Sequence, residues 1–502
     1  MDRVPSDVIG LISKYLRQHD MACCARVCKS WNTIFIPPLY RHIKYTNTVT
    51  RAFVDQLSYG DPSQCSTLNK YSHHTQILEA YGVKFPDPKL LGPNCWFLTE
   101  IRVGGVDGLD DPGWIQRLIN IVNHNPHINK LAVNLVRPGD DLDKLIASRK
   151  LLKGLPELKF LELRGGVIKR KTTLCEIMNY GSRLQQLHFE IEEQVSVEKV
   201  AMIRAEDDFM LSNLHTLSVT YSGPFVEELI QRSPNLRRFS VRTRDHDGIV
   251  SSIQKLIQHY DSGYPICLEH LRLGVMEDCE VTELPLFRLF ELCAEFSGLE
   301  SLSLERIPIT ECITRGLTSF HADTLTKVRL TSCTSYYSSL GIQQILSTCP
   351  KLRCLVTEDM VLYMEDIERS EWICKGLQVL KVYIRGKWPM KPRMDPSLFK
   401  TINELKRHAW HQIEEMIELQ ILHVSTAMDN TDSTKCRHFQ VGDEILCSID
   451  VLTMCGGGME AICKLSRLLE VKTGTKCDRM KETEANVLRL ARPRLRMIAG
   501  LS

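Results

Sequence analysis

A short leucine phrase, Leu-x-x-Leu-x-Leu, returns along most of the chain and limits the fold more than any other feature. Its clear copies begin at Leu158, Leu184, Leu214, Leu236, Leu268, Leu299, Leu325, Leu377 and Leu419. Weaker copies begin at Leu98, Ile128, Leu352, Ile449, Leu468 and Leu495. The last three positions of the phrase alternate apolar, polar and apolar, which is typical of a short strand with one buried face. One copy alone is weak evidence, but so many copies are strong evidence for a repeat architecture.

The spacing of the phrases predicts how the repeats stack. Eight steps separate Leu158 from Leu377, an average of about 27 residues, within the range of about 20–29 that is typical of leucine-rich repeats. Helical patterns lie between the phrases. A single repeat cannot bury its own leucines, whereas stacked repeats form a continuous core. We therefore expect an α/β fold, a solenoid with a curved parallel sheet on its concave side and helices on its convex side.

Length and composition exclude several classes of protein. At 502 residues the chain exceeds a single compact core. A formal net charge of +2 gives no overall attraction to nucleic acid or to an anionic membrane. The first ten residues, MDRVPSDVIG, lack the pattern of a secretory signal. The nineteen cysteines scatter into apolar positions, which indicates thiols in a reducing compartment, the cytosol or the nucleus.

The first forty residues form a separate, helical pattern. Ser6 and Asp7 mark the start of one helix, and Asp20 is a candidate cap for a second, MACCARVCKSWNTIF. Pro37 and Pro38 are expected to end that second helix. A helical unit of this size carries more large apolar side chains than it can bury. It either docks on a partner or caps the domain behind it.

These residues resemble an F-box. The matching features are Val4-Pro5, an apolar helix through Leu16, the run Val27-Cys28-Lys29-Ser30-Trp31, and Leu39-Tyr40. Val4 and Tyr40 stand where the F-box pattern has Leu and Trp, and both keep apolar bulk. The repeats behind this segment are similar to those of F-box/leucine-rich-repeat proteins.

The resemblance implies a function in the ubiquitin conjugation pathway. An F-box binds the Skp-family adaptor of an SCF ubiquitin ligase and through it a cullin, while the repeats bind a protein substrate. The implied role is that of a substrate receptor, with an unknown target. The implied adaptor-binding residues are Pro5, Val8, Ile9, Ile12, Leu16, Met21, Val27, Cys28 and Trp31. The alternative is a non-catalytic scaffold whose N-terminal helices only cap the solenoid.

The expected domains are an F-box at 1–43, a connecting segment with the first irregular repeats at 44–97, and the repeat solenoid at 98–502. An insertion is expected near 384–415, where the phrase interval lengthens. It includes the proline-rich, basic segment KWPMKPRMDPS. Within the connecting segment, residues 72–82 have the pattern of a helix.

No sequence pattern indicates catalysis, a metal or a cofactor. Cys23, Cys24 and Cys28 lack the paired spacing of a zinc site. No phosphate-binding loop or nucleophile elbow is present. We therefore expect a binding protein rather than an enzyme, with protein partners and without nucleic acid or membrane.

The polar positions of the phrases are expected to face out from the concave side. Arg237 and Arg238 begin a basic cluster there. Its candidate substrate-binding members are Arg242, Arg244, Arg272 and Arg329. Such a cluster favours an acidic or phosphorylated segment. Glu162, Glu190 and Glu305 dilute the positive charge, and a merely solvated polar face is the alternative.

Overall fold

The computed structural model divides the chain into two compact units, Met1–Leu236 and Arg237–Ser502, called here unit 1 and unit 2. It describes residues 6–13, 15–46, 71–81, 97–106, 113–135, 146, 150–168, 171–193, 210–220, 223–244, 246–276, 285–333, 335, 337–386, 396–425, 438–441, 444–447, 458–473, 488–491, 494–495 and 497–499.

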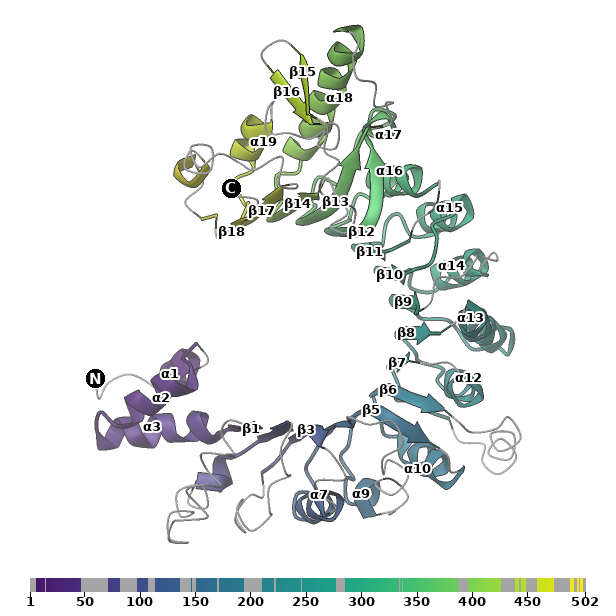
Figure 1. The fold of residues 1–502 in the computed structure, drawn as a ribbon. Helices are drawn as coiled ribbons and strands as arrows, with labels where there is room; N and C mark the ends of the chain where they lie inside the picture. The colour runs from purple at the N-terminus through teal and green to yellow at the C-terminus, as the bar shows by residue number, and fades with distance from the viewer. Residues whose placement is uncertain are drawn as a thin grey trace. The chain divides into compact units, whose positions relative to one another are not determined.

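Unit 1 begins with three helices and continues as a parallel sheet (Figure 1). The helices are α1 (Ser6–Ser13), α2 (Gln18–Ala25) and α3 (Lys29–Tyr40). The strands are β1 (His42–Thr46), β2 (Ile77–Tyr81), β3 (Glu100–Val106), β4 (Lys130–Leu135), β5 (Phe160–Ile168), β6 (Gln186–Glu193) and β7 (Thr216–Thr220), paired in that order. Between and after them lie η2 (Ser72–His74), α7 (Trp114–Asn123), α9 (Lys150–Lys153), α10 (Lys171–Gly181) and α12 (Pro224–Gln231).

Unit 2 repeats the same alternation of strand and helix. Its parallel sheet has the order β8 (Arg238–Thr243), β9 (His270–Val275), β10 (Ser301–Glu305), β11 (Lys327–Thr331), β12 (Cys354–Tyr363), β13 (Val379–Arg385), β14 (Ile421–Ser425), β17 (Glu470–Thr473) and β18 (Met497–Ala499). The helices are α13 (His246–Asp261), α14 (Leu286–Ala294), α15 (Glu311–Phe320), α16 (Ser338–Thr348), α17 (Met364–Ile367), α18 (Pro396–Glu414) and α19 (Gly458–Lys464). A separate antiparallel pair joins β15 (His438–Val441) to β16 (Glu444–Cys447).

The leucine phrase predicts the strands with an unchanging offset. In every copy that the structure describes, the strand begins at the third residue of the phrase. The copy at Ile449 lies outside the described residues. The apolar positions align between neighbouring strands, as Leu271, Leu302 and Val328 do, and all three are buried. The predicted α/β repeat fold is confirmed.

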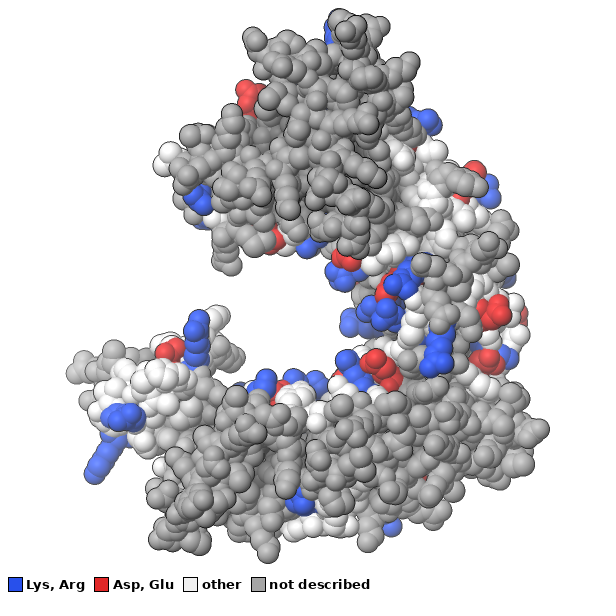
Figure 2. Space-filling model, in the orientation of Figure 1, with Lys and Arg blue, Asp and Glu red and all other residues white. Residues whose placement is uncertain are grey.

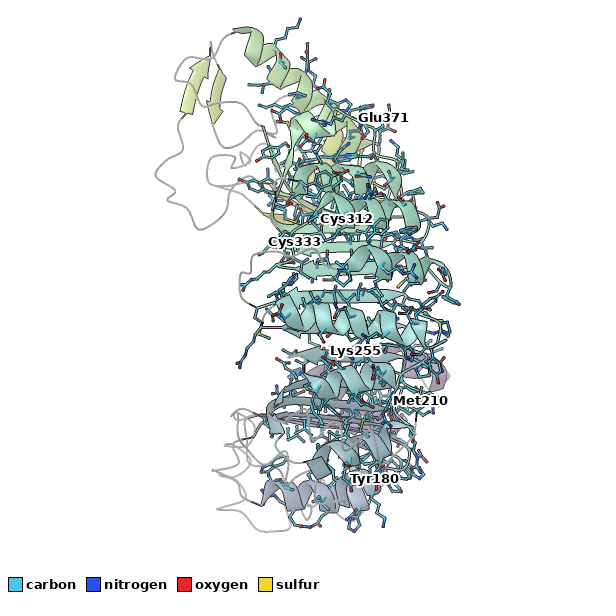
Figure 3. The ribbon with its side chains drawn as sticks, turned by 90° about the vertical axis from the view of Figure 1, so that its right-hand side faces the viewer. Tyr180, Met210, Lys255, Cys312, Cys333 and Glu371 are labelled. Atoms are coloured by element: carbon cyan, nitrogen blue, oxygen red, sulfur yellow. The ribbon has the colours of Figure 1, made fainter. Side chains whose placement is uncertain are left out.

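In unit 2 the strands line the inner side of a curved sheet and α13 to α16 cover its outer side (Figure 1). Seen from the helical side, the helices of neighbouring repeats lie one above another, with Lys255 on α13 and Cys312 on α15 (Figure 3). Apolar side chains from both layers form the core. The polar positions of the strands face the opposite side, where they are available to a partner.

Two expectations about local structure among the repeats need correction or refinement. The predicted helix at 72–82 is wrong, because Ile77–Tyr81 is strand β2, paired in parallel with both β1 and β3. The helix-forming residues of that segment follow the sheet because Leu78 and Ala80 are fully buried there. The expected insertion contains the long helix α18, and residues 387–395 of its basic segment lie outside the described residues.

The N-terminal helices also differ from the sequence prediction. The expected second helix is two helices, since the backbone leaves helical geometry between Ala25 and Lys29, where Cys28 is extended. Pro37 and Pro38 do not end the chain's third helix but lie within it, and α3 runs on to Tyr40. A prolyl ring holds a φ that fits a helix, but it removes a backbone N–H donor and crowds the carbonyl four residues earlier, so the two prolines weaken α3 without ending it.

No helix in the described part of the chain is both long and apolar enough to cross a membrane. The described cysteines are free thiols, and Cys293, Cys333, Cys349 and Cys374 are buried.

Candidate functional site

The three N-terminal helices form a small core of their own. Met21 and Ala25 of α2 are buried against Phe35 and Ile36 of α3. The ring of Trp31 packs 5.5 Å from that of Phe35, measured between centroids. The side-chain amide of Asn32 donates to the backbone carbonyl of Ala25 at 3.1 Å, which ties α3 to α2. A core this small leaves other apolar side chains without cover.

The uncovered apolar residues gather on α1 and on the turn between α2 and α3. Val8, Leu11 and Ile12 are 42%, 55% and 45% exposed, and Tyr15, two residues after the end of α1, is 88% exposed. Val27, in the turn before α3, is 65% exposed. The first four recur at i, i+3, i+4 and i+7, the spacing of one helical face. We call these five residues the apolar stripe. Large exposed apolar groups of this kind mark an interaction surface.

The predicted adaptor-binding residues divide between surface and core. Val8, Ile12, Val27 and Cys28 are exposed, whereas Leu16 and Trp31 are half-buried against the helical core and Met21 lies inside it. Pro5 lies outside the described residues, as does the side chain of Ile9.

Sequence reasoning missed Leu11 and Tyr15. The signal was present, because Leu11 and Tyr15 continue the helical spacing of Val8 and Ile12 in the sequence, although α1 ends before Tyr15. The sequence pattern instead suggested the face that contains Leu16, which points into the core.

A short, hydrogen-bonded joint connects the helices to the repeats. Only Arg41 separates α3 from β1. Its carbonyl accepts the backbone N–H groups of Gln76, at 2.9 Å, and Ile77, at 3.0 Å. The rings of Tyr40 and Tyr71 lie 5.0 Å apart beside this joint. These contacts join the end of α3 to the first strands of unit 1.

The strand face of unit 2 is the second candidate surface. The pairing of the strands aligns its outward residues in three rows across the sheet. The first row is Arg238, His270, Ser301, Lys327, Cys354 and Val379; the second is Ser240, Arg272, Ser303, Arg329, Val356 and Lys381; the third is Arg242, Gly274, Glu305, Thr331 and Glu358. Lys and Arg gather on this face, with acidic residues among them (Figure 2). The carboxylates of the three rows all lie in the third.

Glu305 brings two of the predicted substrate-binding residues together. Its Oε1 atom lies 2.7 Å from Nη2 of Arg242, and its Oε2 atom lies 3.5 Å from Nη2 of Arg272. Gly274 stands between Arg242 and Glu305 in the third row, and a Cβ there would approach Glu305 at 3.3 Å and Arg242 at 3.4 Å. The missing side chain thus leaves room for the ion pair across the intervening strand.

The other two predicted residues, Arg244 and Arg329, are exposed. Arg329 lies in the second row, and Arg244 follows the end of β8. The structure adds Lys327 and Lys381, which the sequence analysis did not select as binding residues. The positive charges of Lys327, Arg329 and Lys381 all act on the thiol of Cys354. Burial raises the pKa of Cys354, and these three cations oppose that rise.

Nothing in the described ranges assembles three or more His, Cys, Asp or Glu side chains in a geometry that could hold a metal ion.

Comparison with known proteins identifies the N-terminal segment. Residues 1–46 match the model of the F-box-like family. No curated protein matches the chain.

Several solved structures are similar in fold. The complex of Rad7 and Elc1 from yeast is 18% identical with a TM-score of 0.41, covering 68% of this chain and 89% of that one. The leucine-rich-repeat protein LegL7 from Legionella pneumophila is 10% identical with a TM-score of 0.29, covering 83% and 98%. The Toll–Spatzle complex of Drosophila is 15% identical with a TM-score of 0.33, covering 72% and 53%. Likenesses this distant carry no argument about function.

Proposed function

Because the chain joins an F-box-like segment to a leucine-rich-repeat array, we propose that it is the substrate-recognition subunit of an SCF-type ubiquitin ligase. In this proposal the N-terminal helices dock on a Skp-family adaptor and through it on a cullin, and the repeats hold a protein target. The observation that carries the proposal is the apolar stripe, which lies within the F-box-like residues 1–46 and is uncovered by the helices' own core.

The chain performs no bond chemistry in this proposal. A receptor accelerates ubiquitin transfer by holding its target near the enzyme, which raises the effective concentration of the reacting groups. In this role the joint at Arg41 connects the docking helices directly to the repeats. The free thiols of the described cysteines fit a place of action in the cytosol or the nucleus.

The docking proposal is tested with the purified full-length chain and a purified Skp-family adaptor, by titration calorimetry. The double variant Leu11→Asp, Val27→Asp places two charges in the apolar stripe. It should weaken adaptor binding by at least about 30-fold, the effect of losing a contact of about 2 kcal/mol at the centre of an interface.

The matched control is Leu490→Asp. Leu490 is 85% exposed and lies outside the F-box-like residues 1–46, so it is an exposed leucine that the docking proposal does not use. This variant should bind the adaptor as the natural chain does. Equal binding by the stripe variant, or no binding by the natural chain, would refute the proposal.

The alternative is a scaffold in which the N-terminal helices only cap the repeats. The joint and the contact of Tyr40 with Tyr71 favour that reading, because they attach the helices to the first strands. It leaves the exposure of the apolar stripe unexplained. It predicts no adaptor binding in the calorimetric experiment, so the same measurement separates the two functions.

A further inference from the structure

The charges on the strand face of unit 2 are segregated by row. The first and second rows contain five cations and no carboxylate, while the third contains Glu305 and Glu358. Of the third row's acids, Glu305 is occupied by Arg242 and Arg272. Glu358 accepts a hydrogen bond from the hydroxyl of Thr331 at 3.5 Å. The acids therefore neutralise one side of the face and leave the other positive.

Among the described residues of unit 2, four of these five cations lack an acidic partner, namely Arg238, Lys327, Arg329 and Lys381, and the last three lie on β11 and β13. Across the part of unit 2 that the structure describes, Lys327, Arg329 and Lys381 make no ion pair, in contrast to Arg242 and Arg272. Lys327 and Arg329 lie two residues apart on β11, and Lys381 lies two strands away on β13. We call these three residues the cation cluster. The strand register places all three around Cys354 and Val356 of β12.

An uncharged floor separates the arms of the cation cluster. Cys354 and Val356 of β12 stand between β11 and β13, and Val356 is buried. A chain crossing the strands at this level passes from Arg329 to Lys381 over the buried, uncharged Val356. Because neighbouring strands are about 4.8 Å apart, Arg329 and Lys381 are anchored about 10 Å apart.

We propose that the cation cluster binds an extended acidic segment of the target protein, with carboxylates about three residues apart. The inference rests on the proposed function and names the class of target. A polyproline II segment advances about 3.1 Å per residue and returns to the same face every third residue, which places two such carboxylates about 9.3 Å apart. That spacing matches the anchors of Arg329 and Lys381. The guanidinium of Arg329 can take one carboxylate in two parallel hydrogen bonds, and Lys381 takes the other.

The charge pattern favours a protein segment over a nucleic acid. The acids of the third row lie beside the cluster and repel a continuous line of phosphates. Tight binding to duplex DNA typically uses about 6–10 phosphate contacts, more than this cluster supplies. The formal net charge of +2 gives no wider field to assist.

The experiment measures fluorescence anisotropy of the full-length chain with a labelled peptide of repeated Glu-Pro-Ala. The double variant Arg329→Gln, Lys381→Gln should bind this peptide about tenfold more weakly, which corresponds to about 1.4 kcal/mol for the two lost surface contacts together. A peptide of repeated Gln-Pro-Ala should not bind. A peptide of the same composition with its glutamates gathered at one end should bind several-fold more weakly than the regular one.

A charge-matched control is available on the helical side. Arg288 of α14 is exposed there and pairs with Glu291 of its own helix, and Lys255 of α13, marked in Figure 3, is half-buried. The double variant Lys255→Gln, Arg288→Gln removes the same charge and should bind the peptide as the natural chain does. Equal losses in both double variants would overturn the proposal, as would tighter binding of a single-stranded oligonucleotide than of the peptide.

Failure of this inference and failure of the proposed function have different signatures. The Arg329→Gln, Lys381→Gln variant keeps the apolar stripe, so its binding to the Skp-family adaptor should be unchanged. Adaptor binding without peptide binding refutes the acidic target and leaves the receptor function standing. Peptide binding without adaptor binding refutes the receptor function and leaves the acidic-segment site standing.

Discussion

The Nδ1 atom of His321 accepts a hydrogen bond from the backbone N–H of Leu299 at 3.1 Å. Leu299 opens the phrase of β10, and His321 ends the helix α15 of the same repeat. In unit 1 the Oδ1 atom of Asn125 does the same for Leu98 at 3.2 Å, after α7. All four residues are buried. A polar side chain at the helix end thus closes each of these repeats by satisfying a backbone donor that water cannot reach.

Substitutions of His321 should therefore show how much of its contribution to stability comes from packing and how much comes from the hydrogen bond. His321→Leu leaves the N–H of Leu299 without a partner and should destabilise its repeat by about 1–3 kcal/mol. His321→Asn supplies the acceptor that Asn125 uses and should lose less. Hydrogen exchange at the Leu299 amide, followed by mass spectrometry, measures the difference. Equal exchange rates in both variants would show that packing, rather than the hydrogen bond, holds the repeat closed.

The same histidine makes stability depend on pH. Burial lowers the pKa of His321 from 6.5 to about 4, against an opposing hydrogen bond with the backbone of Phe290. As the pH falls below 6.5, His321 binds a proton in the unfolded chain but stays neutral in the folded chain. The stabilisation is complete above that pH and is lost as the pH falls toward about 4, by up to about 3 kcal/mol.

Urea unfolding at a series of pH values tests this dependence. In His321→Asn the loss of stability over this window should be smaller than in the natural chain, because the titrating group is gone. The difference between the two proteins isolates His321 from the other titrating groups. Parallel curves for the two proteins would exclude it as the cause.

The strands were predictable because each phrase alternates apolar and polar residues, and the apolar ones are buried on one face of the sheet. β2 was missed because its phrase is degraded: Gln76, Leu78 and Glu79 read equally well as helix, and only pairing with β1 and β3 decides. The break between α2 and α3 was missed because an apolar spacing continues through Val27 while the backbone does not. Local patterns predict elements well where they bury a face, and poorly where a turn interrupts them.

The cation cluster was only partly predictable. The sequence identified Arg329 as a polar position of a phrase. It did not show that Arg329 makes no ion pair within the described part of the folded sheet. Which charges meet depends on the register between strands about 30 residues apart, which irregular repeat lengths hide. Arg242 reaches Glu305 across Gly274 from two strands away, a relationship that only the folded sheet defines.

A buried ion pair in α12 should be sensitive to the loss of one partner. The Nε atom of Arg232 lies 2.6 Å from Oε1 of Glu228, and both side chains are buried. Glu228→Ala leaves the guanidinium without this carboxylate and should cost about 3–5 kcal/mol. Glu157→Ala, which removes an exposed carboxylate 3.0 Å from His127, should cost less than about 1 kcal/mol.

Thermal unfolding followed by circular dichroism compares these two variants. Similar losses in both would show that burial adds nothing to the pair in α12. The double variant Glu228→Leu, Arg232→Met replaces both charges with apolar groups and should recover most of the stability that Glu228→Ala loses.

The buried thiols should resist alkylation while the exposed ones react. Burial raises the pKa of Cys333 and Cys374 to about 12 and that of Cys349 to about 11. Cys23 and Cys28 are exposed on the N-terminal helices. Because the thiolate is the reacting form, iodoacetamide at about pH 8 should modify the exposed pair first. Mass spectrometry of quenched samples measures this order, and urea should abolish it; equal rates without urea would contradict the buried positions.

Trp31 and Val27 should respond differently to substitution although both belong to the predicted interface. Trp31 packs on Phe35 and on the helical core, so Trp31→Ala should destabilise the N-terminal helices by about 1–3 kcal/mol. Val27 is 65% exposed, and Val27→Asp should change their stability by no more than about 0.5 kcal/mol. Hydrogen exchange over α2 and α3 measures both effects. If Val27→Asp loosened these helices as much as Trp31→Ala, the apolar stripe would be part of their core. With the expected result, loss of adaptor binding in Val27→Asp reports contact alone, whereas the same loss in Trp31→Ala mixes contact with unfolding.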